Sequence, residues 1–163
     1  MKKLILIVAS FNLCACGFHF RNKSTLPADM NSINITSNNS SLRSALQDTF
    51  NSIQVKSSMH SPYQLDISNY NLRQSNPSIV IQGAPVTVTY SLTVTAQLSQ
   101  QHKTLATKTF SSSQSIIQNI NSLQVSRPKP SLILQFQNDI VEQIYLWLSS
   151  QSVKQQLRST NAT

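Results

Sequence analysis

The chain is poor in acidic residues, glycine and cysteine. Its 163 residues include only five Asp and Glu, two Gly and two Cys. So few carboxylates argue against carboxylate-rich metal sites and against hydrolases that use paired carboxylates. Because Gly17 and Gly83 are the only glycines, the chain can form neither a Gly-rich phosphate loop nor a G-x-S-x-G nucleophile elbow. These deficits argue against most classes of enzyme.

Charged residues are also scarce, and basic residues outnumber acidic ones. Charged residues make up 11% of the chain, and 13 Lys and Arg against five acidic residues give a net charge of +8. Ser, Asn and Gln together supply 58 residues, while 39% of the chain is hydrophobic. This is enough to build the core of one domain. No stretch approaches the ~20 consecutive apolar residues of a membrane-spanning helix.

The N-terminus has the pattern of a processing signal. Lys2 and Lys3 precede a short apolar segment, residues 4–13, and Cys14-Ala15-Cys16 follows directly after it. A small residue directly before a cysteine resembles the bacterial lipobox, whose cysteine is acylated and becomes the first residue of the mature chain. Gly17 stands where an inner-membrane retention signal would have Asp, so the resemblance implies sorting to the outer membrane. The alternatives are an uncleaved interfacial anchor and a metal or redox pair of Cys14 and Cys16, although no further cysteine completes a metal or redox site.

Hydrophobic periodicity divides the rest of the chain into strands and helices. Strands are expected at residues 31–37 and from Pro62, with a bulge at Ser68-Asn69. Residues 86–99 alternate between apolar and polar without error, which predicts a strand roughly 45 Å long. After a turn at residues 100–103, an antiparallel partner strand is expected from Thr104 to about Ser115.

Two amphipathic helices complete the pattern. The first follows a run of N-cap residues at 38–41 and carries the stripe Leu42, Ala45, Leu46, Phe50 and Ile53. The second is expected to be capped by Ser131, with an apolar stripe that consists of Ile133, Phe136, Ile140, Ile144, Trp147 and Leu148. The order β-α-β-β-β-α predicts an α+β, two-layer sandwich: a four-stranded, mostly antiparallel sheet covered on one face by both helices.

These boundaries predict a domain organisation. Residues 1–15 are expected to be a lipoprotein signal peptide and residues 16–30 an acylated tether. Residues 31–150 should form a single α+β domain, and residues 151–163 a polar, disordered tail.

No catalytic, metal or cofactor site is expected. His19, His60 and His102 are far apart in the sequence, without metal-ligand spacing. Asp139 and Glu142 are three residues apart on a helix, which fits a solvated helix face better than acid–base chemistry. The basic residues are spread along the chain, and a nucleic-acid binder would cluster them with aromatics. Together with the export signal, this argues against nucleic acid as a partner.

Two segments are candidates for ligand contact. In Arg127-Pro128-Lys129-Pro130, two cations lie on a stiff segment just before a helix N-terminus, where backbone N–H groups also favour anions. We therefore take Arg127 and Lys129 as a candidate phosphate site, the alternative being ordinary solvated charges. The loop from Pro77 to Pro85 contains Ile79-Val80-Ile81 and is either a continued strand or an exposed apolar tip that contacts lipid or a partner.

The polar face of residues 86–99 is a candidate partner contact. It carries no charge to deter association, and its hydroxyls can be buried in a wet interface without the desolvation cost of ions. The residues predicted to contact a partner are Thr87, Thr89, Ser91, Thr93 and Thr95. A compositional bias toward Asn, Ser and Gln is the alternative explanation.

The start of the mature chain carries a family resemblance. Cys16-Gly17-Phe18-His19-Phe20-Arg21, an acylated cysteine followed by Gly, aromatic, any residue, apolar and Arg, resembles the LPS-assembly lipoprotein family LptE, also called rare lipoprotein B. The predicted element order, with a long central hairpin and a proline-preceded last helix, is similar to that family's fold. The motif covers six residues, and the similarity in element order spans nearly the whole mature chain.

The resemblance implies a function and partners. Members of that family plug and help to assemble the outer-membrane β-barrel LPS translocon, LptD, bind lipopolysaccharide and are not enzymes. It implies a location on the periplasmic side of the outer membrane or in the barrel lumen. Members can carry a basic residue in the loop where this chain reads Ile81-Gln82-Gly83. This loop of the chain has no basic residue, so Arg127 and Lys129 are the remaining basic candidates for LPS contact. The alternative is a free-standing periplasmic lipoprotein that binds lipid or acts as an enzyme.

Overall fold

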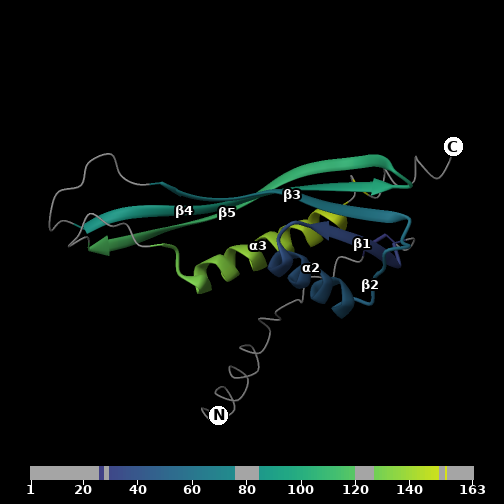
Figure 1. Ribbon diagram of the computed structural model, residues 1–163, viewed down its shortest axis with the longest axis horizontal. Helices are drawn as coiled ribbons and strands as arrows, with labels where there is room; N and C mark the ends of the chain where they lie inside the picture. The colour runs from purple at the N-terminus through teal and green to yellow at the C-terminus, as the bar shows by residue number, and fades with distance from the viewer. Residues whose placement is uncertain (1–25, 28–29, 76–84, 120–126, 151–152, 154–163) are drawn as a thin grey trace, which may run out of the picture.

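The fold is a two-layer arrangement of one sheet and two helices. The computed structural model describes residues 26–27, 30–75, 85–119, 127–150 and 153. In chain order, the elements are β1 (Ser32–Ser37), α2 (Ser40–Ser52), β2 (Lys56–Ser57), β3 (Tyr63–Ser75), β4 (Pro85–Gln100), β5 (Lys103–Asn119) and α3 (Pro130–Leu148). Both helices cover the same face of the sheet (Figure 1). The predicted α+β, two-layer architecture is confirmed.

The sheet has five strands in the order β2-β1-β3-β4-β5, not the four that were predicted. The extra strand, β2, has only two residues and pairs in parallel with β1, opposite Ser32 and Ile33. Because α2 carries the chain back along the sheet, β1 also pairs in parallel with β3. The β3–β4 and β4–β5 pairs are antiparallel. The long strand β4 is therefore an interior strand of the sheet.

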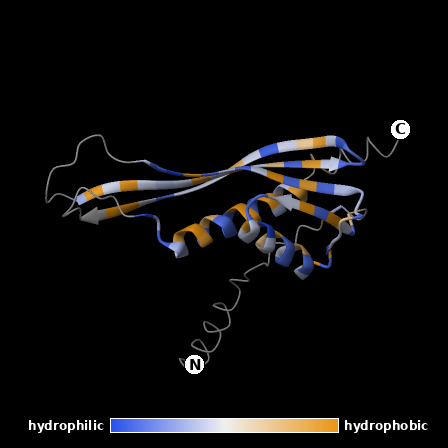
Figure 2. Ribbon diagram, viewed as in Figure 1, coloured by the Kyte–Doolittle hydropathy of each residue, from blue (hydrophilic) through white to orange (hydrophobic). Residues whose placement is uncertain are grey.

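The alternation in β4 determines which side chains enter the core. Every even-numbered residue from Val86 to Leu98 is buried between the sheet and the helices, and Val88, Leu92, Val94, Ala96 and Leu98 are fully inaccessible. Figure 2 shows the alternating hydropathy along the strands. The core also includes Met30 and Val153, which are each 1% exposed and lie outside the 31–150 range assigned to the domain.

The bulge predicted in β3 is present. The register of β3 against β4 shifts between Ser68 and Asn71, and Asn69 has a positive φ of 54°. Before the shift, odd-numbered residues such as Ile67 face the helices, and after it Leu72 does so. One extra residue thus keeps apolar side chains on the helix side of a strand whose sequence changes parity.

The helices begin differently. At α2, the side chain of Asn39 accepts a hydrogen bond from the backbone N–H of Leu42 at 2.9 Å, which confirms an N-cap within residues 38–41. At α3, the predicted cap by Ser131 is wrong. The N-cap residue is Lys129, two residues earlier, so the helix begins at Pro130, and no side chain caps it. Proline has a φ suited to the first helical position and lacks an N–H that would need a partner there.

A buried amide joins both helices to the sheet. Gln137 of α3 is 4% exposed, and its Oε1 accepts a hydrogen bond from Ser41 Oγ of α2 at 2.9 Å. Its Nε2 donates to Tyr70 Oη of β3 at 3.1 Å. Because the two ends of the amide bond to different elements, this side chain helps to fix α2, α3 and β3 relative to one another.

Replacing Gln137 with methionine is expected to lower the free energy of unfolding by about 1–2 kcal/mol. Methionine has a similar size but removes two hydrogen bonds, each of which contributes about 1 kcal/mol. Urea unfolding of the detergent-solubilised protein measures the change. The control is Gln135→Met on the exposed side of the same helix, where a shift within about 0.5 kcal/mol is expected. Equal unfolding midpoints for the two variants would contradict a stabilising role for this amide.

Candidate functional site: the open sheet face and the start of the last helix

One face of the sheet is not covered by the helices. We call its part on β3 to β5 the open sheet face. On β4 and β5 it consists of Thr87, Thr89, Ser91, Thr93, Thr95 and Gln97 with their neighbours Thr107, Thr109, Ser111, Ser113, Ser115 and Ile117. All five residues predicted to contact a partner therefore lie together on one surface. Contact with a partner stays a prediction.

The hydroxyls of the open sheet face bond to one another across the strands. Thr89 Oγ1 and Ser115 Oγ are 2.8 Å apart, and Thr95 Oγ1 and Thr109 Oγ1 are 3.3 Å apart. Each hydroxyl has one proton to donate and two lone pairs. A cross-strand pair therefore leaves further donor or acceptor capacity directed at solvent. The surface can hydrogen-bond to a neighbour while its own groups remain partly satisfied.

The open sheet face carries very little charge. On β3, Asp66 lies opposite Gln97, and Arg73 lies opposite Ser91. The Asp66 carboxylate accepts a hydrogen bond from Thr36 Oγ1 of β1 at 2.7 Å. Along residues 85–100 and 104–117 no charged residue lies on this face, because Lys108 pairs with Ala96 and faces the helix side. Burying this face against another chain would cost far less desolvation than burying an ordinary charged surface.

Arg127 and Lys129 lie just before α3, as predicted. Both side chains are exposed, and Lys129 is the N-cap residue of the helix. The backbone carbonyl of Lys129 accepts hydrogen bonds from the N–H groups of Leu132 at 3.0 Å and Ile133 at 3.3 Å. The segment therefore places two cations beside the positive end of the helix dipole. Cys16 and most of the Pro77–Pro85 loop lie outside the described residues.

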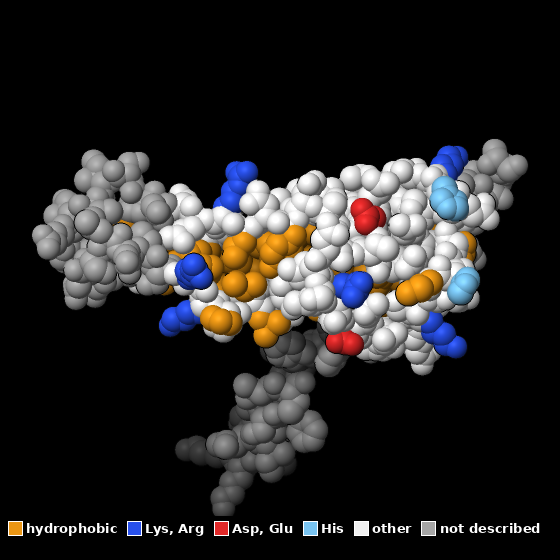
Figure 3. Space-filling view, in the orientation of Figure 1, with side chains coloured by type: hydrophobic (Ala, Val, Ile, Leu, Met, Phe, Trp, Pro, Cys, Tyr) orange, Lys and Arg blue, Asp and Glu red, His pale blue; other side chains and the backbone are white. Residues whose placement is uncertain are grey.

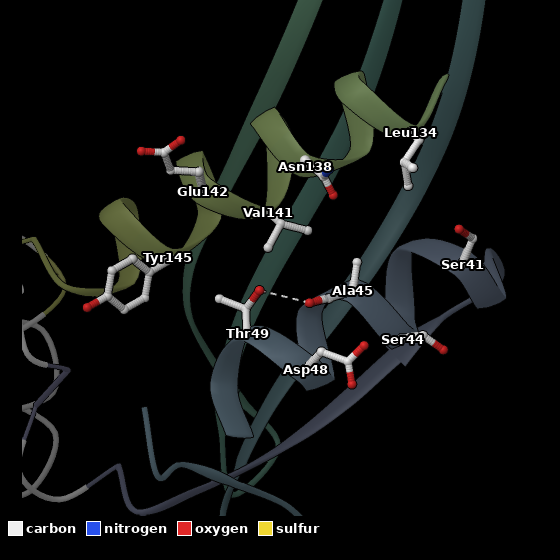
Figure 4. A pocket seen from close by; sticks show the side chains of 10 residues that line it. All are labelled: Ser41, Ser44, Ala45, Asp48, Thr49, Leu134, Asn138, Val141, Glu142 and Tyr145. Carbon is white, nitrogen blue, oxygen red and sulfur yellow. Dashed lines mark hydrogen bonds between the residues drawn. The ribbon is translucent and has the colours of Figure 1, made fainter. Parts of the chain in front are cut away.

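Sequence reasoning missed two hollows on the helix layer. A groove of about 590 Å³ lies between α2 and α3 and has the carboxylates Asp48 and Glu142 at its sides (Figure 4). The hydroxyl of Thr49 in this groove donates to the carbonyl of Ala45 at 2.9 Å, so it serves the helix backbone. Residues from two helices line this groove, and no local sequence pattern signals their approach.

The second hollow, about 360 Å³, lies between β5 and α3. The rings of Phe110 and Trp147 meet edge to face there, with centroids 5.6 Å apart, and Lys108 Nζ lies 5.4 Å from the Phe110 centroid. Such pairs contribute to packing between strand and helix.

The described part of the chain offers no metal centre. No group of three His, Cys, Asp or Glu residues is gathered closely enough there to hold an ion. Neither described helix combines the length and the apolar character that crossing a membrane requires.

Solved bacterial lipoproteins superimpose on this two-layer α+β fold. The minor lipoprotein of Acinetobacter baumannii superimposes with a TM-score of 0.54 at 18% identity, covering 77% of this chain and 93% of its own. Lipoprotein B of Nitrosomonas europaea superimposes with a TM-score of 0.55 at 20% identity, covering 79% and 88%. Rare lipoprotein B of Shewanella oneidensis, at 12% identity and a TM-score of 0.46, is too distant for a detailed comparison of folds.

These similarities establish the fold. No protein-family model matches the chain, and no curated protein matches it by sequence. The chain has the fold of the two lipoproteins from Acinetobacter and Nitrosomonas, and the resemblance noted from the sequence is thereby supported at the level of fold.

Proposed function

We propose that the chain is a non-enzymatic outer-membrane lipoprotein of the LptE type. In this proposal it sits as a plug in the lumen of an LptD-like β-barrel, assists assembly of that barrel, and binds lipopolysaccharide on its way to the cell surface. The fold shared with two solved lipoproteins and the lipobox at Cys16 support the proposal. So does the family resemblance of residues 16–21.

The observation that carries the proposal is the open sheet face. It extends along the 16 residues of β4, and on β4 and β5 it carries hydroxyls and amides in place of ions; its charges, Asp66 and Arg73, are on β3. A free surface domain would normally mix both signs of charge across such an area. A surface of neutral hydrogen-bonding groups instead suits the polar interior wall of a large barrel, where each hydroxyl can bond to wall or water.

The lipid anchor gives the first prediction of this function. Mass spectrometry of the N-terminal peptide of the purified mature protein should identify a lipid-modified Cys16. Several acyl chains on one cysteine hold a protein firmly at a bilayer, because each buried methylene contributes ~0.8 kcal/mol. An N-terminal peptide that retains residues 1–15, or one that begins elsewhere, would exclude this form of anchoring.

Co-purification from membranes tests the function itself. A tagged chain isolated from detergent-solubilised outer membranes should carry a large β-barrel protein in a 1:1 ratio. Recovery of the chain alone would instead support a free-standing periplasmic lipoprotein that binds lipid or acts as an enzyme. Loss of barrel assembly on depletion of the chain would add support for the assembly role.

A further inference from the structure

Three segments that are distant in the sequence meet at one end of the sheet. Lys56 of β2 lies beside Ser32 at the start of β1. The backbone N–H of Gln101, in the β4–β5 turn, donates to the carbonyl of Pro62 at 3.0 Å. This end of the sheet, from the edge strand β2 to the opposite edge strand β5, carries exposed side chains that we call together the turn-end cluster: Lys56, Met59, His60, His102 and Lys103.

The turn-end cluster combines cations with an apolar side chain and includes no acid. Met59 is 89% exposed, the highest value among the large hydrophobic residues of the described chain. Residues 52–63 and 99–104 contain no Asp or Glu. Figure 3 shows both described histidines with basic and hydrophobic side chains at this end of the molecule. A basic surface with a protruding apolar group suits the interface of an anionic bilayer.

The β4–β5 turn holds part of this cluster in an unfavourable backbone conformation. Gln101 and His102 have φ values of 48° and 70°. Two-residue hairpin turns of this kind favour Asn-Gly, because most side chains are strained at positive φ. Strained positions that keep such side chains are often found at functional surfaces. The strain in this turn therefore supports a use for the side chains that it displays.

The route of the chain brings this end toward the membrane. β1 starts at this end with Ser32, sixteen residues after Cys16. Sixteen residues span at most about 56 Å, even when fully extended. The other end of the 16-residue strand β4 lies a further ~50 Å away. A lipid on Cys16 therefore holds this end of the sheet within about 56 Å of the bilayer, whereas the opposite end can lie roughly 50 Å further away.

We propose that the turn-end cluster docks on the surface of the bilayer that holds the acylated Cys16. Lys56 and Lys103 contact phospholipid phosphates, the two imidazoles donate hydrogen bonds to phosphate oxygens, and Met59 inserts among the headgroups. This docking would fix the orientation of the sheet relative to the membrane. It depends on acylation of Cys16, which the proposed function shares, but on neither the barrel nor lipopolysaccharide.

Depth-dependent fluorescence quenching in lipid nanodiscs tests the docking. The acylated mature protein is reconstituted without any barrel into nanodiscs that contain phosphatidylglycerol and lipids brominated near the headgroup. Thr104→Cys, exposed beside Lys103, carries a fluorophore and leaves Met59 in place. The matched control is Ile117→Cys, which is 73% exposed and thirteen residues further along the same strand. We expect quenching at position 104 and none at position 117.

Reversing the charges or changing the lipid distinguishes docking from mere closeness of the anchored domain to the bilayer. The Lys56→Glu/Lys103→Glu variant, or replacement of phosphatidylglycerol by phosphatidylcholine, should abolish quenching at position 104. In the protein that keeps both lysines, high salt should also reduce the quenching at position 104. This measurement tests the role of charge even if the charge-reversal variant does not fold. Met59→Gln should make the quenching weaker.

Three outcomes would overturn the docking. They are equal quenching at positions 104 and 117, quenching at position 104 that survives charge reversal, and a mature chain that does not enter nanodiscs at all. Quenching that requires added lipopolysaccharide would assign the cluster to that ligand instead of phospholipid. Because no barrel is present, failure of co-purification with a barrel and failure of docking are separate results.

Discussion

Replacing Thr89 and Thr93 with lysine should reduce recovery of the β-barrel partner at least tenfold. Both side chains lie on the open sheet face, near the middle of β4. In a closed interface each new ammonium group would lose water without gaining a carboxylate partner. Even a fraction of that desolvation cost exceeds the ~1.4 kcal/mol that corresponds to a tenfold change in affinity. The ratio of barrel to tagged chain after co-purification measures the effect.

The matched control adds two lysines to the helix layer. Ser44 and Asn51 are exposed on α2, and the Ser44→Lys/Asn51→Lys variant has the same net charge as the sheet variant. Urea unfolding should place both variants within about 1 kcal/mol of the parent, because all four positions are on the surface. Equal loss of the barrel in both variants would mean that the open sheet face is not the specific contact. If the sheet variant recovered as much barrel as the parent, the open sheet face would be exposed to solvent and not covered by a partner.

The strands were predictable because their sequence pattern repeats over many residues. The alternation of residues 86–99 extends over fourteen positions, and the structure has β4 at Pro85–Gln100. The change of parity near Ser68 likewise predicted a bulge that the structure has. In contrast, β2 has two residues, too few for any period to be recognised. It pairs with β1 because α2, which connects the two strands, brings the chain back to the start of β1.

The candidate sites could be predicted only where their residues are neighbours in the sequence. One strand supplies Thr87 to Thr95, so their common face followed directly from alternation. Side chains that gather from distant segments gave no such signal. In the sequence, Gln137 is indistinguishable from other polar residues of a helix. Its hydrogen-bond partners Tyr70 and Ser41 lie on other elements, and only the fold brings them next to it. Lys56 and Lys103 likewise lie at the same end of the sheet, on its two opposite edge strands, only because of the way the strands pair.

The start of α3 illustrates the limit for local signals as well. Serine is a favoured N-cap residue, and Ser131 directly precedes the apolar stripe. Proline at the first helical position competes with that signal, and in the structure Pro130 begins the helix. The side chain of Ser131 is exposed instead. The two cations are consequently two residues closer to the start of the helix than the sequence suggested.

Changing Arg127 and Lys129 to serine should lower the affinity for lipopolysaccharide roughly tenfold or more. Both cations lie at the N-terminal end of α3, so their charge adds to the partial positive charge of the free backbone N–H groups. Pro128 and Pro130 restrict the segment and reduce the entropy that binding would cost. Hydrogen bonds to charged groups contribute about 1.5–3 kcal/mol when partly desolvated. One such contact is enough for a tenfold change.

Titration of the detergent-solubilised protein with purified lipopolysaccharide, at two salt concentrations, measures the effect. The matched control is Arg43→Ser/Arg73→Ser, which removes two exposed cations from α2 and β3. Both variants lower the net charge equally, so both should lose the same small amount of long-range electrostatic attraction to lipopolysaccharide. The control should lose no more affinity than this. The difference between the two variants should shrink at high salt, where exposed charges are screened within about 3–8 Å. Thermal stability should stay unchanged, since neither Arg127 nor Lys129 contributes to the core. Equal affinities for the two double variants at low salt would mean that Arg127 and Lys129 act only as solvated surface charges.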